Sequence, residues 1–291
     1  PEPDAVKAAV LTTAQAQPNG GRPAAGGSGG GAGASGGDAA SPPRTKSDGG
    51  AARRAGDSRP AHGSGSGSGS GRGYHDFYVG FHPDTGEDRF YGGGTGGYYV
   101  YDVSDVAAPE LRITLTGVSG VSYGHTFTPD PTGRYVIAET EYQYAPIRVF
   151  DLQPALEGEV TNVRSPISAF TAHWEHLIHN HEVRWPFVFA SGYLDGLQIF
   201  NLMDPYNPQL VGYYDTYIGA PNTDRYSQFN GAFGIDVRNE DGLIVVSDMS
   251  TGLWTFRMEG FGGWDGEQWG LPNISSAQDW DAPALRPEGR P

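Results

Sequence analysis

The chain has 291 residues with no cysteine, 45 glycines and a formal net charge of −15 at pH 7. The lack of cysteine excludes disulfides, thiolate metal sites and cysteine nucleophiles, and no apolar run approaches the roughly 20 residues of a membrane helix. Because most of the 34 acidic residues follow residue 73 and would repel phosphates, no nucleic-acid partner is expected.

Residues 1–19 are similar to the end of a repeat unit that recurs further along the chain. In Pro1–Thr13, as in Asp105–Leu115, a turn with Asp and Pro precedes a more apolar stretch. This pattern predicts the outer strand of an upstream sheet, so that the chain is a fragment of a longer protein. The same strand returning to complete a later sheet is the alternative. Helix propensity instead favours a short Ala-rich helix over Ala5–Ala16.

Residues 20–73 consist mainly of Gly, Ser, Ala, Pro and Arg and end in Gly-Ser repeats. A segment with so few apolar residues cannot bury enough surface to offset the entropy of ordering it. The segment is therefore predicted to be a disordered linker.

Residues 74–260 contain a repeated pattern of strand, turn and strand. The third strand of each unit ends at Val103, Leu152, Leu202 and Met258, which are 49, 50 and 56 residues apart. The second strands recur in step, at Arg89–Gly92, Tyr135–Ala138, Phe187–Ala190 and Leu243–Val246. A period near fifty with four strands in each unit is typical of propeller blades. We therefore predict an all-β fold, a β-propeller of four-stranded blades with about four blades visible, rather than a β-sandwich.

The periodic pattern ends near Gly260, and residues 261–291 form a C-terminal tail. The tail is rich in Trp and Gly. We expect three tryptophans of the tail, Trp264, Trp269 and Trp280, to pack on the last blade.

The unit from His179 to Thr216 resembles the LVIVD-repeat β-propellers, a family that includes the choice-of-anchor B proteins. The resemblance covers roughly Tyr74–Met258, and its residues are His179-Asn180, Gly196–Leu202, Asp204-Pro205, Val211–Thr216, Gly124–Thr126, Gly133–Tyr135, Phe229–Gly234, Val246–Asp248 and Gly252-Leu253. It implies a bacterial protein of unassigned activity. It also implies an extracellular or cell-surface location, although no signal peptide is visible.

Histidines recur where the first strands of the units begin. His75, His125 and His179 stand at this position in three units, and His181 follows two residues later in the third. Because the first strands of a propeller line its central channel, these imidazoles would converge there and could hold a divalent ion such as Zn, Cu, Fe or Ni. Two alternatives stay open. The histidines are structural, or the register places Val79 rather than His75 opposite His125.

Turns between second and third strands should lie at the same face as these histidines. The predicted ligand-binding residues at the channel mouth are Glu139, Glu141, Tyr193, Asp195, Asn230 and Asp248, with Asn230 at the position that histidine takes in the other units. His62, His173 and His176 fall outside the pattern and receive no role.

No complete catalytic motif is present, neither a Gly-x-Ser-x-Gly elbow nor a His-Glu-x-x-His pair. The preferred hypothesis is a secreted or cell-surface propeller that acts as a binding scaffold for a protein or carbohydrate ligand. The alternative is a metal-dependent hydrolase or oxidoreductase with its ion at the histidines. Catalytic residues and oligomeric state are not predicted.

Overall fold

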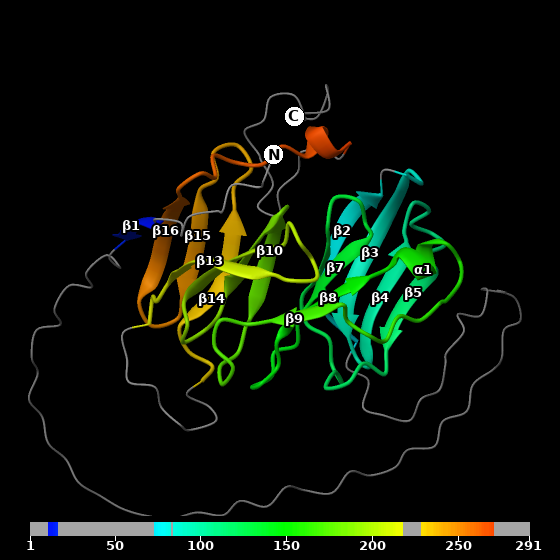
Figure 1. Ribbon diagram of the computed structural model, residues 1–291, viewed down its shortest axis with the longest axis horizontal. Helices are drawn as coiled ribbons and strands as arrows, with labels where there is room; N and C mark the ends of the chain where they lie inside the picture. Colours follow the sequence, from blue (N-terminus) through cyan, green and yellow to red (C-terminus); the bar gives the residue numbers. More distant parts are fainter. Residues whose placement is uncertain (1–10, 17–72, 83, 218–227, 271–291) are drawn as a thin grey trace, which may run out of the picture. The chain divides into compact units, whose positions relative to one another are not determined.

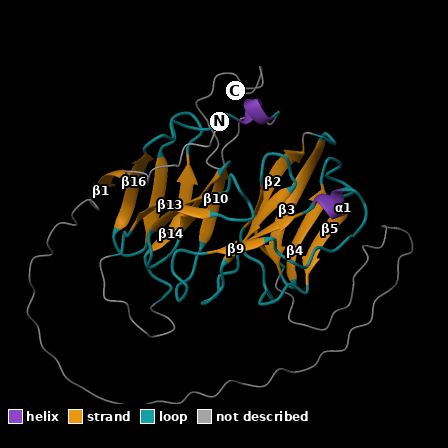
Figure 2. Ribbon diagram, in the orientation of Figure 1, coloured by secondary structure: helices purple, strands orange, loops and turns teal. Residues whose placement is uncertain are grey.

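A computed structural model describes residues 11–16, 73–82, 84–217 and 228–270 (Figure 1). Nearly all of the predicted linker, residues 20–73, lies outside these ranges, as does the tail from residue 271 with Trp280. Regular structure in the described part is almost wholly β (Figure 2), apart from the four-residue helix α1 (Gln153–Leu156) and the 3₁₀ helix η1 (Gly266–Trp269). No helix in these ranges is both long and apolar enough to cross a membrane.

The strands form four antiparallel sheets of four strands each among the described residues. Sheet one contains β2 (Tyr74–His82), β3 (Glu87–Gly94), β4 (Gly97–Asp102) and β5 (Glu110–Thr116). Sheet two contains β6 (Phe127–Pro129), β7 (Tyr135–Ala138), β8 (Ile147–Asp151) and β9 (Ser168–Phe170). Sheet three contains β10 (Asn180–Arg184), β11 (Phe187–Ser191), β12 (Leu197–Asn201) and β13 (Gln209–Tyr214). Sheet four contains β14 (Ala232–Val237), β15 (Ile244–Asp248), β16 (Gly252–Met258) and β1 (Leu11–Ala16).

The four sheets share one register between their second and third strands. Equivalent pairs at the middle of these strands are Val100 with Tyr91, Val149 with Ile137, Ile199 with Phe189, and Thr255 with Val245. The predicted repeat of second and third strands is thereby confirmed, because the strands recur and so does their pairing.

The outer strand of sheet four comes from the beginning of the chain. Strand β1 pairs antiparallel with β16, with Leu11 opposite Met258 and Ala16 opposite Leu253 (Figure 1). Residues 11–16 are therefore a strand rather than the end of an Ala-rich helix. They complete the last sheet instead of belonging to a sheet upstream of β2.

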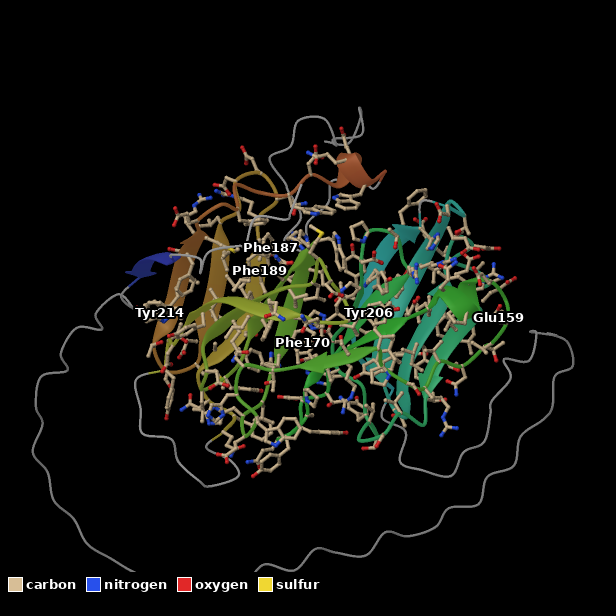
Figure 3. All side chains as sticks on the ribbon, in the orientation of Figure 1. Glu159, Phe170, Phe187, Phe189, Tyr206 and Tyr214 are labelled. Atoms are coloured by element: carbon tan, nitrogen blue, oxygen red, sulfur yellow. The ribbon has the colours of Figure 1, made fainter. Side chains whose placement is uncertain are left out.

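Neighbouring sheets bury their faces against one another. The first strands are in contact in sequence, β2 with β6, β6 with β10, and β10 with β14. Phe127 of β6 lies between sheets one and two, with its ring 5.0 Å from Tyr98 and 5.9 Å from Tyr91. Phe170 and Phe200, 4.7 Å apart, join sheets two and three, and Phe189 on β11 (Figure 3) belongs to the cluster between sheets three and four. This arrangement confirms the predicted all-β fold of propeller blades.

The glycine-rich run 92–97 allows sheets one and two to meet backbone to backbone. A Cβ on Gly93 would stand 1.8 Å from the carbonyl oxygen of His125, and one on Gly124 would stand 2.4 Å from the carbonyl oxygen of Gly97. Only residues without a side chain permit this approach. The start of the first strand in sheet two is thus held directly against sheet one.

Candidate functional site

The first strands place three histidines at one equivalent position. Asp76, Thr126 and Asn180 pair with the corresponding residues of their second strands, which are Gly93, Glu139 and Ser191. The residues immediately before them are His75, His125 and His179. The structure thus gives His75, not Val79, the position of His125. In β2 the position falls at a register shift between Tyr74 and Asp76.

These three histidines lie together. The ring centroids of His75 and His125 are 4.0 Å apart, and those of His125 and His179 are 5.0 Å apart. His75 is exposed, whereas His125 and His179 are buried. The group of three imidazoles therefore extends from the protein interior to the surface.

Phe233, not Asn230, holds the equivalent position in sheet four. Gly234 pairs with Ser247, and the register shift between Ala232 and Gly234 falls at Phe233. The Phe233 ring stacks on His179 with centroids 3.6 Å apart and an angle of 23°. Asn230 instead accepts hydrogen bonds from the Gly231 amide and the Ser250 hydroxyl. The histidines are thus closed off on one side by an apolar ring.

His125 is fixed at one ring nitrogen and unpartnered at the other. Its Nδ1 lies 2.9 Å from Oε1 of the buried Glu139. Its Nε2 is buried, has no hydrogen-bond partner among the described residues, and lies 3.6 Å from Oε2 of Glu141. A histidine held in this way at Nδ1 presents Nε2 for coordination, as metal-bound histidines commonly do.

Three carboxyl groups, those of Asp76, Glu139 and Glu141, surround these imidazoles. Burial raises the pKa of Glu139 well above its usual range, and the charges of Glu141 and Asp76 raise it further. Burial lowers the pKa of His125, so this imidazole is neutral near pH 7 and does not balance the carboxylates. A cation at Nε2 would balance them, and would let Glu139 ionise and accept the Nδ1 proton.

His179 and Glu141 are also held in fixed orientations. Nδ1 of His179 lies 2.8 Å from the Phe233 carbonyl oxygen, to which it donates, leaving Nε2 as the electron-pair donor. The Tyr193 hydroxyl donates a short hydrogen bond to Oε1 of Glu141, and its ring lies 5.4 Å from His179. Tyr193 has a positive φ of 45° on the turn after β11, a rare conformation for a residue with a side chain.

The geometry matches a site for a first-row divalent metal. The ligand atoms of His75, His125 and Glu141 all lie within 4.8 Å of one another. Metal bonds of about 2.1 Å at tetrahedral angles separate ligand atoms by roughly 3.4 Å, close to the 3.6 Å between His125 and Glu141. Imidazole and carboxylate ligands together suit Zn, Fe, Cu or Ni. His179 adjoins this set as a further imidazole.

A polar layer lies directly behind the histidines. The Thr126 hydroxyl is 3.1 Å from Oδ2 of Asp76 and 2.9 Å from Oδ1 of Asn180, and so bridges sheets one, two and three. Sequence reasoning missed this layer. Its residues Asp76, Thr126 and Asn180 each follow one of the three histidines in the sequence. Only the pairing of first and second strands in the structure shows that these three side chains meet.

The remaining predicted site residues lie elsewhere. Glu139, Glu141 and Tyr193 join the histidines as described, whereas Asp195 contacts His176 in a separate cluster. Asp248 accepts hydrogen bonds from the Thr216 hydroxyl and from the amides of Ser250 and Thr251. It therefore stabilises the turn before β16.

His181 occupies a core position. It pairs with Ala190, and in sheet two the equivalent residue is Phe127, which pairs with Ala138. Both ring nitrogens of His181 are buried without a partner among the described residues. Burial lowers the pKa of His181 to about 3. His181 therefore belongs to the packing between blades and not to the set formed by His75, His125 and His179.

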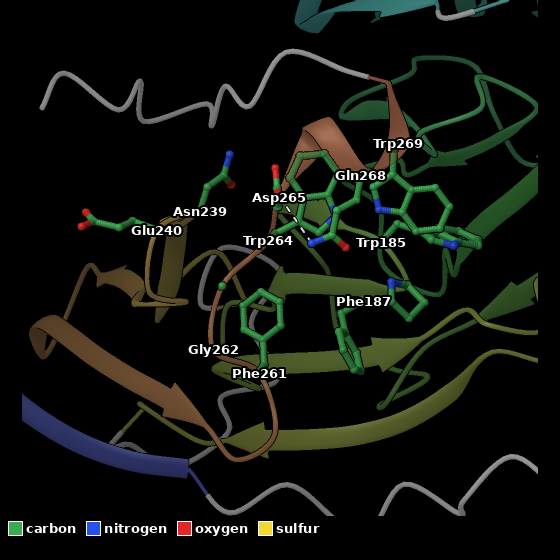
Figure 4. Close-up of a pocket in the computed structure, with 12 residues that line it drawn as sticks. Trp185, Phe187, Asn239, Glu240, Phe261, Gly262, Trp264, Asp265, Gln268 and Trp269 are labelled. Carbon is green, nitrogen blue, oxygen red and sulfur yellow. Dashed lines mark hydrogen bonds between the residues drawn. The ribbon is translucent and has the colours of Figure 1, made fainter. Parts of the chain in front are cut away.

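A pocket lies at the other end of the strands of sheets three and four. The pocket has a volume of about 510 Å³. Figure 4 shows its walls, which combine the rings of Trp185, Phe187, Phe261, Trp264 and Trp269 with the polar side chains of Asn239, Glu240, Asp265 and Gln268. Trp264 packs against the core of sheet four, as predicted, whereas Trp269 is 40% exposed.

Comparisons with known proteins find similarity among solved structures only. No protein-family model and no curated protein matches the chain. A computationally designed protein, Ika4, is similar with a TM-score of 0.38 and 10% identity, over 60% of this chain and 86% of that one. The β-propeller domain of Cps50 (Swd1) from Myceliophteria thermophila has a TM-score of 0.34 and 8% identity, over 60% of this chain and 58% of that one. Both similarities are distant, and the fold assignment rests on the sheets themselves.

We predict that His181→Leu stabilises the protein, most strongly in acid. An apolar side chain removes two unpartnered buried nitrogens, so the free energy of unfolding at pH 7 should rise by about 1–2 kcal/mol. Because the folded-state pKa of His181 lies below the ordinary value of 6.5, the unfolded chain takes up the proton first. Wild-type stability should therefore fall as the pH drops below about 6.5, by roughly 2 kcal/mol at pH 5 from this residue.

Urea unfolding at pH 7, 6 and 5, with EDTA present throughout, measures this difference. The variant should lose less stability than the wild type over this range. Equal losses in the two proteins would show that His181 is not held neutral in the core.

Proposed function

We propose that this protein is a binding module of propeller blades that holds a divalent transition-metal ion where its first strands begin. One observation carries the proposal. The buried Nε2 of His125 has no hydrogen-bond partner in the described part of the chain and lies 3.6 Å from Oε2 of Glu141, and His75 offers a further ligand atom in the same cluster. The propeller-like fold supports a scaffold role, and a divalent ion is the ligand that the surrounding chemistry fits.

Each residue has a defined part in this proposal. His75, His125 and Glu141 coordinate the ion, with His179 as the adjacent imidazole. Glu139, the Phe233 carbonyl and Tyr193 orient His125, His179 and Glu141 respectively, which is how ligands of a metal are usually positioned. Exposure of His75 leaves a route by which the ion or an external ligand reaches the site.

A metal-dependent enzyme, hydrolase or oxidoreductase, is the second candidate. The three ligands His75, His125 and Glu141 leave a coordination position open to water or substrate, as in catalytic zinc sites. The buried carboxyl of Glu139 favours this candidate, because burial raises its pKa and so favours the protonated form that a general acid requires. Turnover of a substrate that depends on the bound ion distinguishes an enzyme from a scaffold.

We predict that the untagged full chain binds Zn²⁺ at His75, His125 and Glu141, and that His125→Ala removes binding at this site. The variant should lose one equivalent of zinc in equilibrium dialysis with elemental analysis. Glu139→Gln keeps the ligands and should weaken binding by about 10–100-fold, because it changes only the partner of Nδ1. His82→Gln is the matched control, since His82 is also buried but lies near Thr85. Equal zinc content in all four proteins would refute the metal site.

The aromatic pocket supports a carbohydrate ligand for the same module. Trp rings in the lining offer flat apolar faces, and the polar side chains of Gln268 and Asp265 stand beside them. Two carboxylates in the lining, Glu240 and Asp265, favour a neutral glycan over an acidic one. A protein ligand at this pocket is the alternative.

We predict that Trp269→Ala weakens binding of neutral oligosaccharides at least 10-fold, because it removes an exposed ring from the pocket. Calorimetric titration of a panel of neutral oligosaccharides into the full chain measures the effect. Trp174→Ala is the control, since Trp174 is 59% exposed but does not line the pocket. Binding that neither substitution changes would place the sugar elsewhere, and no binding by any member of the panel would favour the protein ligand.

We also propose that the chain belongs with the LVIVD-repeat propellers and acts outside the cell or on its surface. The fourfold recurrence of strand pairing at a spacing near fifty residues supports this assignment. Recovery of the protein from culture medium or washed cell surfaces, rather than from the cell interior, is the test.

A further inference from the structure

A second group of metal-binding side chains lies in the connection between β9 and β10. His173 and His176 stand three residues apart there, and their rings stack with centroids 3.9 Å apart at an angle of 18°. Asp195, from the turn between β11 and β12, completes the group. The ligand atoms of these three residues all lie within 4.8 Å of one another. None of them takes part in the histidine set of the first strands.

The Asp195 carboxylate is held in place by its turn. The amide of Asp195 donates to the carbonyl of Gly192, and the amide of Gly192 donates to the carbonyl of Gly196, at 2.8 Å each. Oδ1 of Asp195 lies 2.5 Å from Nδ1 of His176. One ligand is therefore anchored on a tight turn, and two come from the facing loop.

The position and burial of His173, His176 and Asp195 fit a site for an exchangeable cation better than a simple ion pair. An ion pair needs only Asp195 and one histidine, whereas here a second imidazole stacks on the first and places a ligand atom within 4.8 Å of the carboxylate oxygen. Asp195 and His176 are half-buried and His173 is exposed, so solvent can reach the group from one side. Two imidazoles and one carboxylate on one side of an ion leave its other positions open.

We propose that His173, His176 and Asp195 form a second divalent metal site, separate from the one at His75, His125 and Glu141. The site takes an ion of the zinc or ferrous type and leaves part of its coordination to water or to a ligand from outside. It neither requires nor repeats the proposed first site, because the two share no ligand. They are neighbours along the chain, since Tyr193 and Asp195 lie on the same turn.

Zinc titration of the untagged full chain tests this proposal, with Co²⁺ absorption as a second readout. The wild type should bind two equivalents. His173→Ala/His176→Ala should bind one, with the remaining equivalent unchanged in affinity, and the lost one weakened at least 100-fold. His125→Ala should also bind one, and the triple variant should bind none. Substitution of Asp195 is avoided because its turn carries Tyr193.

Glu175→Gln is the matched control, because Glu175 lies in the same loop but outside the group, and it should retain both equivalents. If the double variant is unstable, the single variant His173→Ala serves in its place, because it changes only an exposed side chain. It should also weaken binding of one equivalent. Two equivalents in the double variant, or equal losses in the control, would overturn the second site. Loss of binding only in His125→Ala would support the first site and refute this one.

Discussion

The structure depends on the burial of sheet faces against neighbouring sheets. A sheet of four short strands cannot cover both of its faces by itself, so each depends on the next. Rings such as Phe127 and Phe170, which lie between sheets, supply this contact. At roughly 25 cal/mol for each Å² of apolar surface, one buried ring contributes a few kcal/mol. Packing of this kind fixes how the first strands stand beside one another.

The histidine set is a consequence of that packing combined with a shared register. Each of three sheets contributes one imidazole from the same position, so residues about fifty apart in the chain meet. The carboxylates of Asp76 and Glu141 bring negative charge that the neutral imidazoles cannot offset, and this charge adds to burial in raising the pKa of Glu139. A cation satisfies both the geometry and this charge.

Much of the architecture could be predicted from the sequence because it repeats. Apolar alternation and turn chemistry recur in each unit, so second and third strands are visible in a single chain. The histidines could be selected because they recur at the same place in three units. The sheet to which strand β1 belongs could not be predicted. Its strand pattern fits the edge of any sheet, and its partner β16 lies at the far end of the chain.

What could not be predicted depends on local backbone irregularity. In sheet four a register shift places Phe233 at the position that an Asn-Gly pattern assigned to Asn230. His181 follows His179 by two residues, yet it fills a core position that Phe127 holds in sheet two. His173 and His176 lie in an aperiodic loop, and only the fold brings Asp195 to them.

Crystals of the full chain grown with Zn²⁺ and measured on both sides of the zinc absorption edge test the central claim most directly. The account predicts an anomalous peak about 2.1 Å from Nε2 of His125, with Glu141 and His75 as the adjoining ligands. A zinc-containing crystal with no anomalous density between the first strands of sheets one, two and three would contradict it.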